Sequence, residues 1–211
     1  MKYINVDKVL SQNADLHILE YDDNHSPRCI GGSFEMNSNY NDVFFCERYQ
    51  VEVDLTRVPP SVKETGRKIS SDYTHRYSNG GLCLEAPANI ITTCVRSECF
   101  DFDVWFKCFL IPYFFSYEYF KLYHSFPFGE RSHGMNGILE YYMELFHLSN
   151  IQQVREFVVQ VSRMSCYRGH HMCPCGSGLK IRNCHSDEVK LAMTPVLKEC
   201  ILFDTKELCR Q

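Results

Sequence analysis

The chain has 211 residues, of which 45% are hydrophobic and 14% aromatic, and its formal net charge is −4. This amount of apolar material supports one full domain with a small extra module, and it excludes intrinsic disorder. The slightly acidic balance provides no general basic field, so we do not expect nucleic acid as a partner.

The sequence predicts a reduced, cytoplasmic protein with no membrane partner. Its most apolar stretch, residues 104–119, contains Lys107, Pro112 and Glu118, which favours a buried helix over a membrane span. The first seven residues lack the apolar run of a signal peptide. Disulfide-dense domains are short and exported, so most cysteines outside two clusters are expected to be reduced packing residues. This expectation covers most of Cys29, Cys46, Cys94, Cys99, Cys108, Cys200 and Cys209.

The first elements in chain order are predicted to be a short helix and then strands. Apolar spacing indicates the helix around residues 6–10, and residues 28–36 read as a strand. Residues 37–42 have the Asn and Asp content of a turn. In residues 47–55 apolar and polar side chains alternate, which is typical of a half-buried antiparallel strand. A shorter strand at residues 61–70 completes the predicted meander.

Helices are predicted to follow. Residues 101–123 are apolar almost all round, and Pro112 should kink or split that helix. Amphipathic helices are expected at residues 138–146 and 151–161. Strands first and helices afterwards predict the α+β class.

Local signals predict two further helix boundaries. Ser149 with Gln152 forms a capping box at the start of one helix. Ser186 should begin a C-terminal helix that continues to Cys200 despite Pro195.

Residues 75–87 set a single cysteine, Cys83, directly after a Gly-Gly-Leu sequence. The glycine pair permits backbone conformations closed to other residues. Leu82 and Leu84 are expected to point into the core and to fix the direction of the sulfur. This arrangement suits a nucleophile on a rigid loop that is open on one side. The alternative is a hairpin corner with a buried cysteine.

A second cysteine cluster lies near the end of the chain. Cys173 and Cys175 are one residue apart, and Cys184 and His185 follow after eight more residues. Two thiolates and a later Cys-His pair can close a tetrahedral zinc site, which would stabilise a segment too short for its own core. The alternatives are a redox pair or unligated thiols.

This knuckle resembles the SEC-C motif, a small zinc module found at the ends of bacterial proteins. The Cys-Pro-Cys-Gly-Ser-Gly sequence and the later Cys-His pair match the motif over about residues 170–186. The resemblance implies a docking element with a structural zinc ion. His170 or His171 could replace His185 as the fourth ligand. Nearby basic residues are interpreted as a solvated face: Arg163, Arg168, Lys180 and Arg182.

Residues 28–165 resemble ubiquitin-conjugating enzymes. His75 begins the segment, and Gly-Leu-Cys-Leu-Glu surrounds Cys83 as in that family. The Phe-Gly-Glu-Arg-Ser-His-Gly sequence of residues 128–134 is similar to divergent bacterial members. The resemblance implies an antiparallel meander packed on helices, within a catalytic domain at residues 1–165. A zinc knuckle and a C-terminal helix would form a second domain at residues 166–211.

The resemblance also implies thioester chemistry. Cys83 would accept the C-terminal carboxyl of a protein and pass it to an amine of a protein or small molecule, and Glu85 would orient or deprotonate that amine. The alternative for Glu85 is a solvent-facing acid. Bacterial members with such a knuckle occur in anti-phage operons of the cyclic-oligonucleotide signalling type (CBASS). The expected acyl donor is therefore the C-terminus of a cyclic-oligonucleotide synthase.

One departure from the family concerns the oxyanion of the thioester. The family's His-Pro-Asn reads His-Arg-Tyr at residues 75–77, so the asparagine is absent. Backbone amides near Gly81 or Cys83, or the side chain of His133, are candidate donors. His75 either polarises the site or holds the loop, and we favour the second role. His133 either reaches the cysteine or caps the next helix, and Tyr77 is interpreted as a packing residue.

Two other classes of function compete with the transferase. A cysteine protease or deconjugating hydrolase would pair Cys83 with His75 or His133, although no local protease signature is present. A non-catalytic adaptor would use the fold and the zinc knuckle for binding alone.

Overall fold

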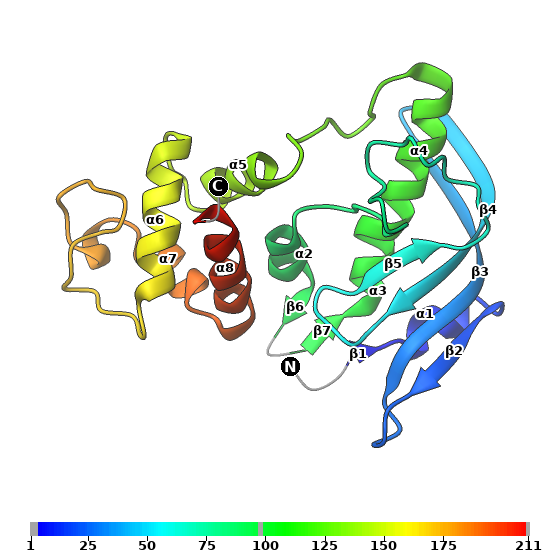
Figure 1. Ribbon diagram of the computed structural model, residues 1–211, viewed down its shortest axis with the longest axis horizontal. Helices are drawn as coiled ribbons and strands as arrows, with labels where there is room; N and C mark the ends of the chain where they lie inside the picture. The colour runs from blue at the N-terminus through cyan, green and yellow to red at the C-terminus, as the bar shows by residue number, and fades with distance from the viewer. Residues whose placement is uncertain (1–3, 97–98, 210–211) are drawn as a thin grey trace. The chain divides into compact units, whose positions relative to one another are not determined.

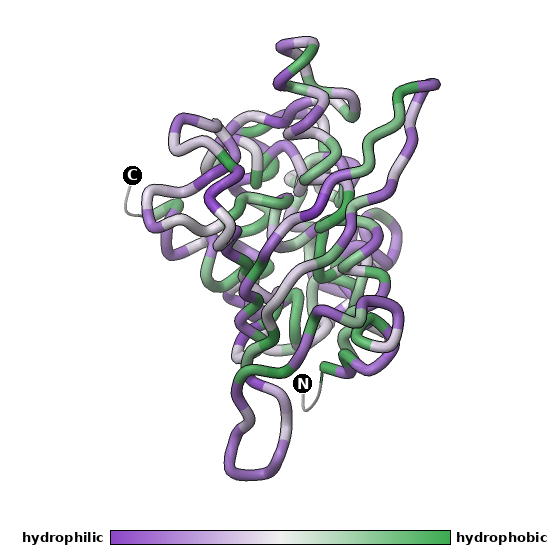
Figure 2. The backbone as a smooth tube through the Cα atoms, turned by 90° about the vertical axis from the view of Figure 1, so that its right-hand side faces the viewer, coloured by the Kyte–Doolittle hydropathy of each residue, from purple (hydrophilic) through white to green (hydrophobic). Residues whose placement is uncertain are grey.

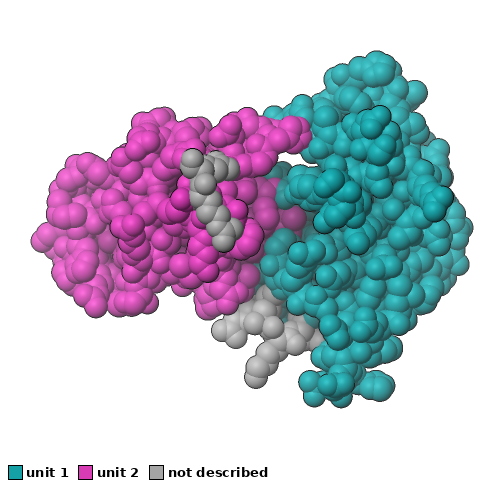
Figure 3. Space-filling model, viewed as in Figure 1, with its two compact units in different colours: residues 1–85, 93–130 teal, residues 86–92, 131–211 magenta. Residues whose placement is uncertain are grey.

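The computed structural model describes residues 4–96 and 99–209. The chain forms two compact units, one of residues 1–85 and 93–130 and the other of residues 86–92 and 131–211 (Figure 3). The boundary predicted between residues 165 and 166 falls inside the second unit, and the division into a catalytic and a knuckle domain stays a prediction. Each unit is described below by itself.

The first unit is built on a four-stranded antiparallel sheet in the order β2-β3-β4-β5 (Figure 1). Its strands are β2 (Leu16–Tyr21), β3 (Pro27–Tyr40), β4 (Val43–Asp54) and β5 (Ser61–Glu64). Together with the helices of the chain, this sheet confirms the predicted α+β class.

The alternation in residues 47–55 is confirmed as the pattern of a strand with one buried face. Tyr49, Val51 and Val53 of β4 are each no more than 1% exposed, while polar residues occupy the other face. Tyr49 packs on Phe114 of the helix that covers this face, with ring centroids 4.0 Å apart. Figure 2 colours the backbone by hydropathy and shows short hydrophobic and hydrophilic stretches in turn along the chain.

The sheet also differs from the sequence prediction. Strand β2 was not predicted, and the predicted turn at residues 37–42 is mostly paired strand. The turn itself is confined to Asn41 and Asp42, whose φ angles are 48° and 63°. Strand β5 ends at Glu64, well before residue 70, because the Glu64 carboxylate accepts the amides of Lys68 and Ile69 and folds the chain back.

The remaining elements of the first unit precede or follow the four strands along the chain. A small sheet pairs β1 (Ile4–Asn5), β7 (Cys99–Asp101) and β6 (Val95–Arg96), and α1 spans Asp7–Gln12. The predicted helix at residues 101–123 is split into α3 (Phe102–Trp105), a π-helical turn (Phe106–Leu110) and α4 (Ile111–Tyr123). Pro112 lies at the start of α4, directly after the π-helical turn, and the helical backbone continues through it.

The second unit is helical. Its elements are α2 (Pro87–Cys94), which ends in the first unit, α5 (Met135–Leu145), α6 (Ile151–Arg163), the 3-10 turn η2 (Ile181–Asn183), α7 (Ser186–Ala192) and α8 (Pro195–Leu208). Phe146 joins the core of this unit, with its ring centroid 5.6 Å from Tyr142 and 5.0 Å from Phe157.

The predicted start of α6 was wrong, whereas α7 begins at Ser186 as predicted but ends before Cys200. Asn150 caps α6 by accepting from the Gln153 amide, so the capping pair lies one residue beyond Ser149 and Gln152. The single C-terminal helix is two helices, because Pro195 occupies the first turn of α8 and begins a new helix.

Within residues 4–96 and 99–209, no helix has the length and apolarity needed to cross a membrane.

Candidate functional site

Residues 75–83 form a small hairpin in the first unit. The Cys83 amide donates to the His75 carbonyl at 2.8 Å, and the Tyr77 amide donates to the Gly81 carbonyl at 2.8 Å. Arg76 and Leu82 pair between these bonds as an antiparallel bridge. The bonds fix the register of the hairpin, and therefore which side chains share a face.

The second strand of this hairpin, residues 81–83, pairs with the main sheet. The Leu82 amide donates to the Val62 carbonyl of β5 at 2.9 Å, and Lys63 bridges Gly81. Leu82 is buried as expected, at 7% exposed. Leu84 is half-buried, so its expected direction into the core stays a prediction. One leucine and the sheet hydrogen bonds hold Cys83 in place.

Cys83 is a half-buried thiol whose surroundings shift its pKa. Burial raises the pKa of this thiol, the nearby Glu85 charge raises it further, and a hydrogen bond from the Tyr77 side chain opposes both. The thiol is therefore mostly protonated at neutral pH. The predicted role of Glu85 in the reaction stays a prediction.

The contacts of His75 favour its structural role. Its carbonyl accepts from the Tyr113 hydroxyl at 3.0 Å as well as from the Cys83 amide. Its Nε2 lies 3.5 Å from Glu130 Oε1, and its ring meets Phe126 edge-on at 5.0 Å. These contacts hold the start of the hairpin.

His133 belongs to the second unit, in an exposed loop before α5. Gly134 is the N-cap of α5 and no side chain caps the helix, so the capping role weighed for His133 is not found. Its predicted role at Cys83 stays a prediction.

Two oxyanion donors weighed from the sequence are already engaged. The Cys83 amide bonds to His75, and the Gly81 amide bonds to Asn79 Oδ1 at 2.9 Å. Tyr77, interpreted as packing, is 56% exposed and bonds to Cys83 through its hydroxyl. The Asn79-Gly80 pair is a strong hairpin signal that could have predicted this neighbour from the sequence.

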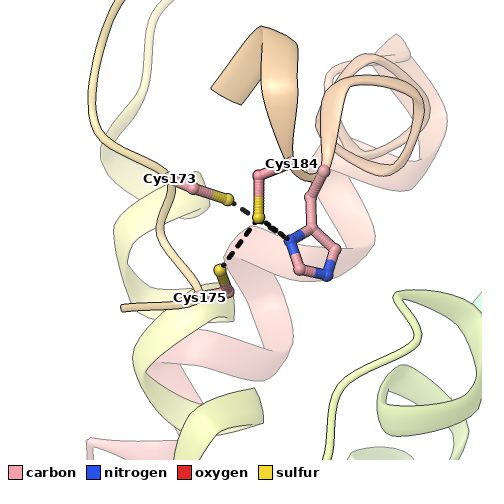
Figure 4. A group of neighbouring side chains, drawn as sticks. Cys173, Cys175 and Cys184 are labelled. Atoms are coloured by element: carbon pink, nitrogen blue, oxygen red, sulfur yellow. Dashed lines mark hydrogen bonds between the residues drawn. The ribbon is translucent and has the colours of Figure 1, made fainter. Parts of the chain in front are cut away.

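The second cluster gathers three thiols and one imidazole at the predicted positions in the second unit (Figure 4). Cys173 Sγ lies 3.4 Å from His185 Nδ1, and Cys184 Sγ lies 3.1 Å from the same nitrogen. Cys175 Sγ lies 3.5 Å from Cys184 Sγ. The four ligand atoms all lie within 4.8 Å of one another, so this group could hold a metal ion.

The donor set fits zinc. Ligand atoms at zinc–sulfur and zinc–nitrogen distances of about 2.3 and about 2.0 Å stand roughly 3.5–3.8 Å apart in a tetrahedron, close to the separations found here. Burial would raise the pKa of Cys175, but hydrogen bonds from Ser177, Cys173 and Cys184 outweigh it and lower that pKa to about 6, while burial raises the pKa of the neighbouring Cys173. A thiolate therefore forms readily at this position, as a metal ligand requires.

Backbone turns hold the four ligands together. The Cys173 amide donates to the Leu179 carbonyl at 2.8 Å, and Met172 bridges Lys180 across the knuckle. Gly176 and Gly178 have φ angles of 78° and 74°, which favour glycine. His170 and His171 are exposed and lie edge-on to each other, so His185 is the histidine that completes the described cluster.

The knuckle is anchored on α6. Gln153 Nε2 donates to the Cys175 carbonyl at 2.7 Å, and Phe157 packs edge-on against the His185 ring at 5.7 Å. At the other end of α6, Lys198 donates to the carbonyls of Ser162 and Met164, each at 2.9 Å. The C-terminal helix therefore secures the helix that carries the knuckle.

The cysteines predicted to be packing residues divide into two groups. Cys94 is buried, and Cys29 and Cys200 are partly buried. The prediction is wrong for four others, which are exposed: Cys46, Cys99, Cys108 and Cys209. A small thiol on a strand or helix leaves no sequence pattern that distinguishes its two faces.

Comparisons with protein families, curated proteins and solved structures find no match to this chain.

Proposed function

We propose that this chain is a cysteine-dependent acyl transferase that carries a protein C-terminus as a thioester on Cys83. The observation that carries the proposal is the setting of that thiol. It is half-buried on a hydrogen-bonded hairpin of the first unit, shares a face of that hairpin with Tyr77, and has a pKa that the Glu85 charge raises.

The reaction needs an activated acyl donor, such as a thioester or an acyl adenylate of a protein C-terminus. The Cys83 thiol loses its proton, its sulfur bonds to the carbonyl carbon, and the donor's leaving group departs. An amine then attacks the thioester carbon and gives up a proton, for which Glu85 is the proposed acceptor. The C–S bond breaks and the Cys83 thiolate is reprotonated, while the acyl chain leaves as an amide.

The proposed architecture is a divergent ubiquitin-conjugating fold. The antiparallel meander of β2 to β5 precedes the cysteine hairpin, and helices follow, in the order the resemblance implies. On the same resemblance, the proposed donor is the C-terminus of a cyclic-oligonucleotide synthase in bacterial anti-phage defence. The acceptor is an amine of a protein or small molecule.

Zinc is the metal we propose for Cys173, Cys175, Cys184 and His185. Three sulfurs and one nitrogen fill all four positions of a tetrahedral ion, which is typical of structural zinc. The ion would therefore stabilise the knuckle and leave the reaction to the Cys83 hairpin.

The setting of Cys83 disfavours a hydrolase of the protease type. Cysteine proteases lower the pKa of their nucleophile by pairing it with a histidine, whereas burial and Glu85 raise the pKa of Cys83. A transferase can keep its thiol protonated until a donor docks.

The test is incubation of the purified chain with a thioester peptide and then with free lysine. We expect an acyl adduct on Cys83 that lysine releases as an amide, and no adduct on the Cys83→Ala variant. Release of free acid at the same rate with and without lysine would favour the hydrolase. An equal adduct on Cys83→Ala would exclude Cys83 as the acceptor.

A further inference from the structure

The pairing of the hairpin places Tyr77 and Cys83 diagonally on one face. Side chains alternate between the two faces of a β-ladder. Because Arg76 pairs with Leu82, whose side chain is buried, the neighbouring side chains of Tyr77 and Cys83 share the opposite face. Diagonal neighbours on one face lie within reach of a long aromatic side chain.

Gly81 leaves room for the tyrosine ring. Gly81 lies directly opposite Tyr77, and a Cβ atom added to it would stand 3.4 Å from Tyr77 Cδ2 and 3.1 Å from Asn79 Oδ1. A side chain at Gly81 would therefore crowd Asn79 and touch the Tyr77 ring. With glycine there, the ring lies against the hairpin on the face that also carries Cys83.

The Tyr77 hydroxyl is a permanent donor at physiological pH. Burial of the phenol, together with the hydrogen bond to Cys83, raises its pKa above the ordinary value of 10.0. The proton therefore stays on the tyrosine oxygen while the thiol reacts, and that oxygen donates to whichever neighbouring atom carries most negative charge.

We propose that the Tyr77 hydroxyl donates to the carbonyl oxygen of the thioester on Cys83, in place of the asparagine that this sequence lacks. This inference rests on the proposed transferase function. The amides of Gly81 and Cys83 are engaged with Asn79 and His75, so a side chain must serve in their place. Tyr77 shares a face of the hairpin with Cys83, and its ring lies beside Gly81, so it is the described side chain placed to serve.

The hydroxyl changes its acceptor as the reaction proceeds. In the free protein it donates to the sulfur. When the sulfur bonds to the acyl carbon its electron density falls, and negative charge develops on the carbonyl oxygen as each tetrahedral intermediate forms. The hydrogen bond then moves to that oxygen, which is the interaction that lowers the barrier. Tyr77 thus acts on the substrate in both the loading and the transfer step.

The test compares Tyr77→Phe with Tyr21→Phe, a matched removal of a hydroxyl from a half-exposed tyrosine elsewhere in the first unit. Acylation of Cys83 by a thioester peptide is followed by intact mass, and iodoacetamide labelling of Cys83 is followed over pH by peptide mapping. We expect Tyr77→Phe to slow acylation about 100- to 1000-fold at matched thiolate fraction. The Tyr77 hydrogen bond lowers the pKa of the Cys83 thiol. Its removal should therefore raise that pKa and move the midpoint of Cys83 labelling to higher pH. Tyr21→Phe should leave both unchanged.

The outcomes separate this inference from the function on which it rests. If Cys83 is acylated in the wild type and Tyr77→Phe is as fast as Tyr21→Phe at matched thiolate fraction, the oxyanion role is overturned and the transferase stands. A shifted labelling midpoint with unchanged acylation would show that Tyr77 tunes the thiol only, which also overturns the proposal. If the wild type forms no adduct, the transferase fails and the oxyanion role fails with it.

Discussion

The Cys83 hairpin and the Cys173 knuckle use the same side chain in opposite ways. The hairpin carries one half-buried thiol, whose pKa Glu85 and Tyr77 shift in opposite directions. The knuckle gathers three thiols and an imidazole whose ligand atoms lie within 4.8 Å of one another. A metal needs several lone pairs converging on one point, whereas acyl transfer needs one sulfur with an open side. Neighbouring groups therefore decide what a cysteine does.

Glycine also differs between the two regions. In the knuckle, Gly176 has nothing within 4 Å of an added Cβ, but its φ of 78° is one that other residues adopt with strain. In the hairpin, the position of Gly81 is crowded by Tyr77 and Asn79 instead. The knuckle needs glycine for backbone conformation, and the hairpin needs it for space.

The largest effect is expected on breaking the knuckle. Cys175→Ser should abolish stoichiometric zinc in the purified protein and lower the melting temperature of the second unit by about 10 °C or more, because metal binding and folding of such segments are linked. Metal analysis and thermal melts measure the two effects. Cys166→Ser is the matched control, since Cys166 is an exposed thiol outside the cluster. Equal zinc content in both variants would contradict a metal site at the cluster.

A smaller effect is expected in the order of thiol alkylation. Hydrogen bonds from Arg168 and Ser165 lower the pKa of the exposed Cys166, whereas burial raises the pKa of Cys83. At pH 7, iodoacetamide should therefore label Cys166 several times faster than Cys83, since the thiolate is the reactive form. As pH rises, the midpoint of Cys166 labelling should lie below pH 9.0, and that of Cys83 labelling should lie above it. Quantitative peptide mapping over pH reads both rates. Faster labelling of Cys83 at pH 7 would contradict the protected-thiol description.

The smallest effects are expected at the two glycines. Gly176→Ala should lower the free energy of unfolding of the metal-loaded protein by about 1 kcal/mol, because alanine is strained at this φ. Gly81→Ala should change stability less, but it should shift the pH midpoint of Cys83 labelling by displacing Tyr77. Denaturant unfolding and labelling, run on both variants, measure the pair. A shift in the pH midpoint of Cys83 labelling in Gly176→Ala, without one in Gly81→Ala, would contradict the roles given to the two glycines.

Local patterns in the sequence predicted much of the fold and the knuckle. Alternation in residues 47–55 identified β4, and the Cys-Pro-Cys spacing identified a group that could hold a metal. Both signals are short and continuous in the chain. Strand β2 was missed because its six residues are mostly exposed and carry little apolar alternation.

Features that depend on pairing were harder to predict. The contact between Tyr77 and Cys83 follows from the hairpin register, which the Asn79-Gly80 turn and the sheet set together. The Gly81 and Cys83 amides were weighed as oxyanion donors for the same reason. Their acceptors, the Asn79 side chain and the His75 carbonyl, are visible only in the folded chain. Pro195 was placed inside a helix because residues 189–200 keep helical spacing across the break between α7 and α8.

The most direct test of the account is the intact mass of a Cys83→Ser chain produced in cells together with the proposed cyclic-oligonucleotide synthase. Serine would convert the transient thioester into a stable ester, because an alkoxide is a poorer leaving group than a thiolate. The account predicts a mass equal to the two chains minus water, cleaved by hydroxylamine and absent from Cys83→Ala. An unshifted Cys83→Ser chain, or the same adduct on Cys83→Ala, would contradict it.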